Sequence, residues 1–284
     1  MQPPLINLDK LVRDAHQLKP LPATVTRLAS MVANPDTPMN KIVEVITFDQ
    51  VLTAKIINAA NAAFSAPRTP INNVQRAIVR IGTGMTLSLA TAASIHKRMN
   101  MACPAYGLNE GDLWRHSVAA ALSCDVMRAF CDSPVPQASF TAALLHDVGK
   151  LMLGRMLSPE AVQYMQECQI KYGLSRLQAE EKLLKVNHSQ VGGLMAKQWK
   201  FPKVIIRGIL YHHDPDAGKN PICDVVHVAD YVAHRVTPIK NYIPDAQGLE
   251  PDAVARLGFR IDQFELLCTR VSQRLDEVLK LFGL

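Results

Sequence analysis

Histidine and aspartate side chains gather in the second half of this 284-residue sequence. Seven of the nine histidines lie between residues 116 and 234, and several stand beside an aspartate. Imidazole nitrogens with carboxylate oxygens suit iron, manganese or zinc, and no paired cysteines accompany them as in a structural zinc site. The pattern predicts a hydrolytic site for one or two divalent ions: iron, manganese, zinc or magnesium. The candidate metal ligands are His116, His146, Asp147, His188, His212, His213 and Asp230.

The run from Ala142 to Lys150 carries the most distinctive part of this pattern. His146 and Asp147 stand next to each other at the end of an apolar segment, where both side chains can bind one ion or bridge to a second. Gly149 permits close approach. Lys150 follows Asp147 by three residues, so on a helix the two share a side and the ammonium can contact a phosphate oxygen. Asp147 and Lys150 are therefore the candidate catalytic residues, and the alternative for Lys150 is a helix C-cap.

The other histidines are interpreted more plainly. We expect His16, His96 and His234 to be hydrogen-bonded core or surface residues. His227 precedes Asp230 by one helical turn, so it either orients a ligand or packs in the core, and it stays outside the candidate set. Asp112, one turn before His116, could supply a further carboxylate.

These side chains need helices to position them. Apolar residues recur every three or four positions, and no run of strand-like alternation interrupts them, so the predicted fold class is all-α. Asp49 is expected to cap one helix, and Gly82 to end another in a left-handed conformation. Beyond residue 111, helices are expected over 112–130, 137–153, 159–172, 176–184, 188–199, 202–211, 222–236 and 262–282.

Residues 97–111 have the weakest periodicity and contain Pro104 and two glycines. A segment with few core contacts marks a boundary between units. The sequence therefore predicts an N-terminal helical lobe at 1–98, followed at 99–284 by a helical lobe that carries the candidate metal site.

Composition limits the environment and the partners. The six cysteines are scattered without a paired motif, and no secretory signal or membrane anchor is visible, so we expect reduced thiols, a cytoplasmic location and no membrane partner. The net charge of +6 is modest. The densest basic run of the sequence is interpreted as a solvated face of a helix. A nucleic-acid partner is not expected.

The candidate ligands resemble the HD superfamily of metal-dependent phosphohydrolases, whose pattern is His, then His-Asp, then a distal Asp. His116, His146-Asp147 and Asp230 match that order. His188 and the pair His212-His213 resemble the added ligands of relatives with two or three metals, including the HD-GYP phosphodiesterases. However, no Gly-Tyr-Pro segment follows His213, which argues against a cyclic di-GMP phosphodiesterase.

The first lobe narrows the resemblance to the HDOD (HD-related output domain) family. The matching stretches of this lobe are Leu21-Pro22-Ala23, residues 49–63 and residues 77–82. Residues 188–193 of the second lobe are also similar to the family, and the resemblance spans about residues 15 to 235. Gln50 and Ala62 replace residues that are commonly Pro and Ser in the family. The family implies an HD-type helical core with an N-terminal helical lobe, and a role in bacterial signal transduction.

We therefore expect an output or regulatory protein with an HD-type metal site. The alternative is an active phosphohydrolase that acts on a nucleotide or another phosphate ester. The expected partner is a signalling protein or a phosphate-containing small molecule. The sequence leaves the oligomeric state open.

Overall fold

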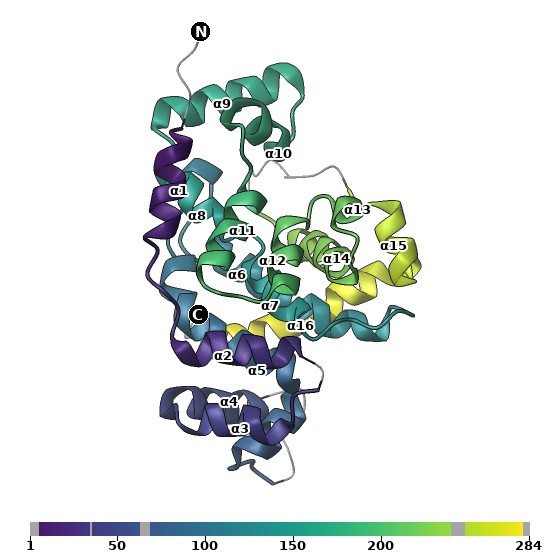
Figure 1. Cartoon of the computed structure of the whole chain (residues 1–284). Coiled ribbons are helices and arrows are strands. Elements are labelled where there is room, and N and C mark those ends of the chain that lie inside the picture. The colour runs from purple at the N-terminus through teal and green to yellow at the C-terminus, as the bar shows by residue number, and fades with distance from the viewer. Residues whose placement is uncertain (1–5, 35, 63–68, 240–247, 281–284) are drawn as a thin grey trace.

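The computed structural model describes residues 6–34, 36–62, 69–239 and 248–280. Within these ranges the regular structure consists of α-helices with short 3₁₀ and π turns, as the apolar periodicity predicts. Figure 1 shows a central group of helices, with α3 and α4 at one end of the molecule and α9 and α10 at the other. The all-α fold class is confirmed.

Within the described ranges, the first part of the chain forms five helices, and the last of them is long. They are α1 (Leu8–His16), α2 (Ala23–Ala33), α3 (Met39–Thr47), α4 (Gln50–Ala62) and α5 (Val74–Met99). α2, α3 and α4 pack on α5 because each buries an apolar face, such as Val25, Leu28 and Val32 of α2. Asp49 accepts a hydrogen bond from the backbone N–H of Leu52 at 3.0 Å, as expected for a helix start.

α5 is kinked at Gly82, where φ is +82° and ψ is 159°. The predicted interruption is present, although helical structure resumes immediately after it. By length and composition α5 could cross a membrane, but 56% of its most apolar window is buried inside the protein. The core helix of a soluble protein passes the same test, so this helix is weak evidence for a membrane span.

The second part of the chain forms the helices that carry the candidate ligands. α6 (Asp112–Val126), α7 (Ser139–Leu145) and α14 (Pro221–Val236) pack against one another, and α16 (Phe264–Lys280) covers α6 and α14. Every residue of α7 is buried, which makes it a core helix. The remaining helices are α8 (Gly149–Met156), α9 (Pro159–Tyr172), α10 (Arg176–Ala179), α11 (His188–Gln198), α12 (Lys203–Leu210), α13 (Pro215–Gly218) and α15 (Pro251–Leu257).

The single helix expected over 137–153 is wrong, because the chain turns at residues 146–148 between α7 and α8. In a continuous helix, consecutive side chains point about 100° apart. At this turn both His146 and Asp147 reach the same cluster, with His146 Nε2 3.4 Å from Oδ2 of Asp147. The helix expected over 176–184 also changes geometry, since α10 continues into η3 (Glu180–Leu184), a single π-helical turn.

A continuous cluster of buried apolar side chains runs through the described part of the chain, from Ile6 to Leu279. α5 contributes to it from the N-terminal side and packs directly on α7. The division at 98/99 falls at the end of α5, and the two-lobe organisation stays a prediction.

Candidate metal centre

Four candidate ligands meet in the core although they come from different helices. His116 lies on α6, His146 and Asp147 in the turn after α7, and Asp230 on α14. The Nε2 atom of His116 lies 3.2 Å from Nε2 of His146 and 3.0 Å from Oδ1 of Asp230. His146 Nε2 lies 3.4 Å from Oδ2 of Asp147 and 3.2 Å from Oδ1 of Asp230. All four side chains are buried.

These distances suit atoms that share one ion. Ligands about 2.0–2.2 Å from an ion, in tetrahedral or octahedral order, stand about 2.8–3.6 Å from one another. The His116–Asp147 distance of 3.6 Å lies at the upper end of this range. The first group therefore has the spacing and the nitrogen and oxygen donors of a metal centre.

A second group of histidines adjoins the first through Asp147. His188 begins α11, and His212 and His213 follow α12. His188 Nε2 lies 2.9 Å from His213 Nε2 and 3.4 Å from Oδ1 of Asp147. One oxygen of Asp147 thus faces the first group and the other faces the second, which is the arrangement of a bridging carboxylate.

Three of the imidazole rings are fixed by contacts at Nδ1, which leave Nε2 as the atom that could bind a metal. When Nδ1 donates its proton to a carbonyl or a carboxylate, Nε2 carries the lone pair that binds an ion. Nε2 of His212 is buried and has no hydrogen-bond partner among the described residues, as expected for a ligand atom. The Nδ1 contacts are His146 to Ala143 O at 2.6 Å, His212 to Ile209 O at 2.7 Å, and His188 to Glu180 Oε2 at 2.8 Å.

The electrostatics of the cluster also suit a cation. Burial and the nearby His234 lower the pKa of His116 to about 4, so this ring is neutral at physiological pH. Burial alone would lower the pKa of His146, but Asp147 and Asp230 raise it to about 10. The pKa values of both carboxyl groups lie well below their usual range despite burial, because cationic neighbours favour the charged form. The site therefore holds two buried carboxylates, whose charge a divalent ion can balance.

Lys150 supports Asp147 from the side. Its Nζ lies 2.7 Å from Oδ2 of Asp147, and only 1% of the lysine is exposed. It stands in the first turn of α8, so the alternative of a helix C-cap is wrong. Both candidate catalytic residues, Asp147 and Lys150, thus lie at the cluster, and their catalytic roles stay predictions, as do the ligand roles of the metal set.

Sequence reasoning missed His234, Glu180 and Tyr106. His234 Nε2 lies 3.4 Å from Oδ1 of Asp230, and its ring centroid lies 4.5 Å from that of His116. The usable signal was its position four residues after Asp230. Glu180 is fully buried behind His188, and the Tyr106 hydroxyl donates to it at 2.8 Å.

The remaining polar residues lie outside the ligand groups. His227 accepts the backbone N–H of Glu250 at 2.9 Å, and its Nδ1 contacts the carbonyl of His212 at 2.8 Å, so it supports the backbone of a candidate ligand. Asp112 instead accepts the backbone N–H of Asn109 at 2.7 Å.

Comparisons with known proteins agree with the fold. The structure resembles an HDOD domain protein of unknown function from Geobacter sulfurreducens (TM-score 0.66, 21% identity, 96% of this chain and 97% of that chain). It also resembles a candidate signal transduction protein from Marinobacter aquaeolei VT8 (TM-score 0.71, 19% identity, 97% of this chain and 64% of that chain). A candidate phosphohydrolase from Shewanella amazonensis SB2B gives a TM-score of 0.64 at 20% identity, over 95% of this chain and 96% of that chain.

Sequence comparison gives the family directly. An uncharacterized protein of Treponema pallidum (strain Nichols) is 20% identical over 195 residues, which are 68% of this chain and 37% of that longer protein. The chain thus spans well under half the length of this relative. The model of the HDOD domain matches residues 18–215, which is more than half of the chain. The protein belongs to the HDOD family.

Proposed function

We propose that this chain is a bacterial signal-transduction output protein, whose histidine and aspartate cluster binds one or two divalent ions and which regulates a partner protein. Membership of the HDOD family supports a signalling role, as does the similarity in fold to the candidate signal transduction protein of Marinobacter aquaeolei. All six cysteines are free thiols, which supports the cytoplasm as the location.

The candidate ligands divide into two sets. The first ion would be held by His116, His146, Asp147 and Asp230. The second would be held by the other three histidines and the second oxygen of Asp147. A set so rich in imidazole favours iron, manganese or zinc over magnesium, which prefers oxygen ligands.

Burial of the cluster is the observation that carries the regulatory proposal. Hydrolysis needs room for a phosphate ester beside the ions. In the described part of the chain, the hollow lined by His116, Asp147, Lys150 and His234 is too small to hold a water molecule. A buried ion there would stabilise the fold or report its occupancy to a partner, because metal binding is coupled to folding.

Phosphoester hydrolysis is the second candidate, and the position of Asp147 favours it. Its two oxygens face both ligand groups, as in sites where two ions share a carboxylate. Bound ions would supply Lewis-acid stabilisation of phosphoryl oxygens and acidify a water molecule. Lys150 would hold Asp147 in place and keep a positive charge beside the phosphate.

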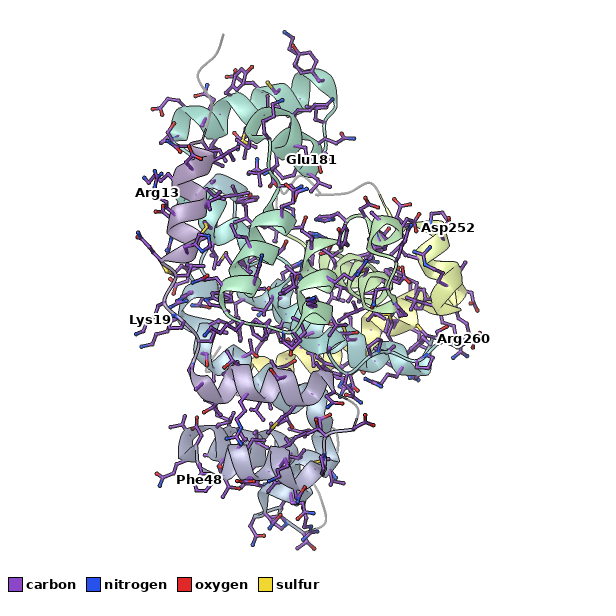
Figure 2. All side chains as sticks on the ribbon, viewed as in Figure 1. Arg13, Lys19, Phe48, Glu181, Asp252 and Arg260 are labelled. Carbon is purple, nitrogen blue, oxygen red and sulfur yellow. The ribbon has the colours of Figure 1, made fainter. Side chains whose placement is uncertain are left out.

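Elemental analysis of protein purified without chelators tests the metal centre, and Asp147→Ala tests its role. Turnover of a generic phosphodiester is measured with manganese, iron and magnesium, together with thermal unfolding. Asp252→Ala, which removes an exposed carboxylate on α15 (Figure 2), is the matched control.

We expect metal in the wild type, less metal in Asp147→Ala, a metal-dependent melting temperature and no turnover. Wild-type turnover that Asp147→Ala abolishes would establish the hydrolase instead. Wild-type protein with neither bound metal nor a metal-dependent melting temperature would refute the metal centre.

A further inference from the structure

A cavity of about 430 Å³ lies outside the metal centre. It is bordered by α1 and the residues after it, the last turns of α5, one face of α8, and α11. Figure 1 shows α1 alongside α8 at this edge of the molecule. His16 and Gln198 close the border between α1 and α11, since Nε2 of Gln198 donates to the His16 carbonyl at 2.9 Å. The volume is in the range of sites for small organic ligands, about 300–1,000 Å³.

The cavity and the metal cluster use opposite faces of α8. Lys150 points toward Asp147, whereas Leu151, Met152, Arg155 and Met156 line the cavity. At about 100° per residue these four positions centre roughly 170° around the helix from Lys150. The cavity is therefore a separate site rather than an extension of the metal centre.

The rim of the cavity is basic. Lys10, Lys19, Arg98 and Arg155 line it against one carboxylate, Asp14, which gives a local charge of four minus one, or +3. Figure 2 shows Lys19 at the outer edge of the molecule. None of the four cations forms an ion pair with another described residue.

Arg98 gives a specific reason to expect an anion. Its Nη1 atom is buried and has no hydrogen-bond partner among the described residues. A buried donor without an acceptor is unfavourable, and a guanidinium is suited to the paired oxygens of a carboxylate or phosphate. An anionic group at this rim would supply that acceptor.

The inner wall of the cavity is apolar and adaptable. Met99, Met152 and Met195 are buried in it beside Trp199, and Leu18 and Met156 lie at its half-buried edge. Methionine side chains adjust their shape to an apolar ligand at little cost. The wall would accept a hydrocarbon or aromatic body but offers little to a fully polar ligand.

We propose that this cavity binds a small amphiphilic anion, whose apolar body lies on the methionine wall and whose carboxylate or phosphate group is bound by Arg98 and the neighbouring lysines. This site does not depend on whether the metal centre binds ions. The ligand would serve as an input signal, since α8 joins the cavity to Asp147 and Lys150.

Fluorescence titration of the full chain with anilinonaphthalene sulfonate, an aromatic anion, tests the proposal. The neutral dye phenylnaphthylamine, which lacks the sulfonate, separates charge recognition from apolar binding. Arg98→Gln removes the rim cation, and Lys97→Gln removes the exposed neighbouring charge on α5, which does not line the cavity. Circular dichroism checks that each variant is folded, and Lys19→Gln replaces Arg98→Gln if the latter does not fold.

We expect the sulfonate dye to saturate one site and to bind about tenfold more weakly to Arg98→Gln, as loss of a charge-assisted hydrogen bond implies. Lys97→Gln should bind the sulfonate dye as the wild type does. The neutral dye should bind the wild type at least about tenfold more weakly than the sulfonate dye does. Equal binding of the dye to Arg98→Gln and wild type, or equal binding of both dyes, would overturn the proposal. Displacement by octyl phosphate or by octanoate then identifies the head group, and displacement by neither would also overturn it.

Discussion

Replacing Glu180 by glutamine removes one negative charge from behind His188 and keeps the shape of the side chain. Glu180 Oε2 accepts the backbone N–H of His188 at 2.7 Å and contacts its Nδ1 at 2.8 Å, and Oε1 accepts the Tyr106 hydroxyl at 2.8 Å. A carboxylate on Nδ1 makes the opposite nitrogen a better ligand. The variant therefore weakens a proposed ligand without removing it.

The contacts of Glu180 predict different effects of the substitution on metal affinity and on folding stability. In glutamine, Oε1 can accept both His188 donors, and the Tyr106 hydroxyl can turn to accept from the amide. We expect unfolding free energy in chelator to change by no more than about 1–2 kcal/mol, while metal affinity falls about 10–100-fold. Glu180→Ala instead leaves three buried donors unpaired at about 1–3 kcal/mol each, so it should cost at least about 3 kcal/mol.

Competition with a chromophoric chelator measures affinity and ion number, and urea unfolding with excess chelator measures stability. Glu181→Gln is the control, because that neighbouring residue is exposed and its carboxylate accepts from Asn187 Nδ2 at 2.9 Å, away from His188. Wild-type affinity and ion number in Glu180→Gln would refute the idea that Glu180 tunes a metal ligand.

Three further predictions follow from packing, linkage and burial. Gly149→Ala should destabilise the protein by about 1–3 kcal/mol or more in urea unfolding, since its Cβ would lie 1.9 Å from the His188 carbonyl oxygen; Gly193→Ala, which meets only a side chain at 3.3 Å, should cost less. An ion at one hundred times its dissociation constant should raise the melting temperature by about 4–5 °C, because about 2.7 kcal/mol of binding energy acts on a chain of this length. Burial raises the pKa of Cys223 to about 12 and that of Cys131 to about 11. The folded state keeps these thiol protons, whereas the unfolded state loses them above about pH 8.5, so the free energy of unfolding should fall as pH rises above that value. Labelling of these thiols should be slow until urea unfolds the protein.

The helices and most of the cluster could be predicted because each ligand is a polar residue inside an apolar, helix-periodic segment. His116 and Asp230 interrupt otherwise buried faces of α6 and α14, and such residues need partners. The pairing of His146 with Asp147 carries its own signal. Local pattern and chemistry therefore agree at these positions.

The positions that sequence reasoning missed depend on tertiary contacts. No helix-breaking residue precedes the turn at residues 146–148, since Gly149 comes after the turn. The close approach of Gly149 to the backbone of His188 joins residues that are far apart in the sequence. In the sequence, Glu180 and Glu181 look like two adjacent surface residues. In the structure, Glu180 is buried within the π-helical turn. His234 was expected to be ordinary because no pattern distinguished it from a partly exposed helix residue.

The charge balance of the cluster argues that its arrangement serves ion binding rather than stability. Asp147 and Asp230 are buried at 1% and 7% exposure, and buried ion pairs are seldom more stable than well-packed apolar residues. If every imidazole were neutral, Lys150 would balance the charge of only one of the two carboxylates. The raised pKa of His146 means that, without metal, a proton on this ring supplies the second positive charge. A divalent ion would replace that proton and use the lone pairs that the fixed Nδ1 contacts leave on Nε2. The helices thus hold a set of groups whose cost of burial is offset most fully when a cation lies among them.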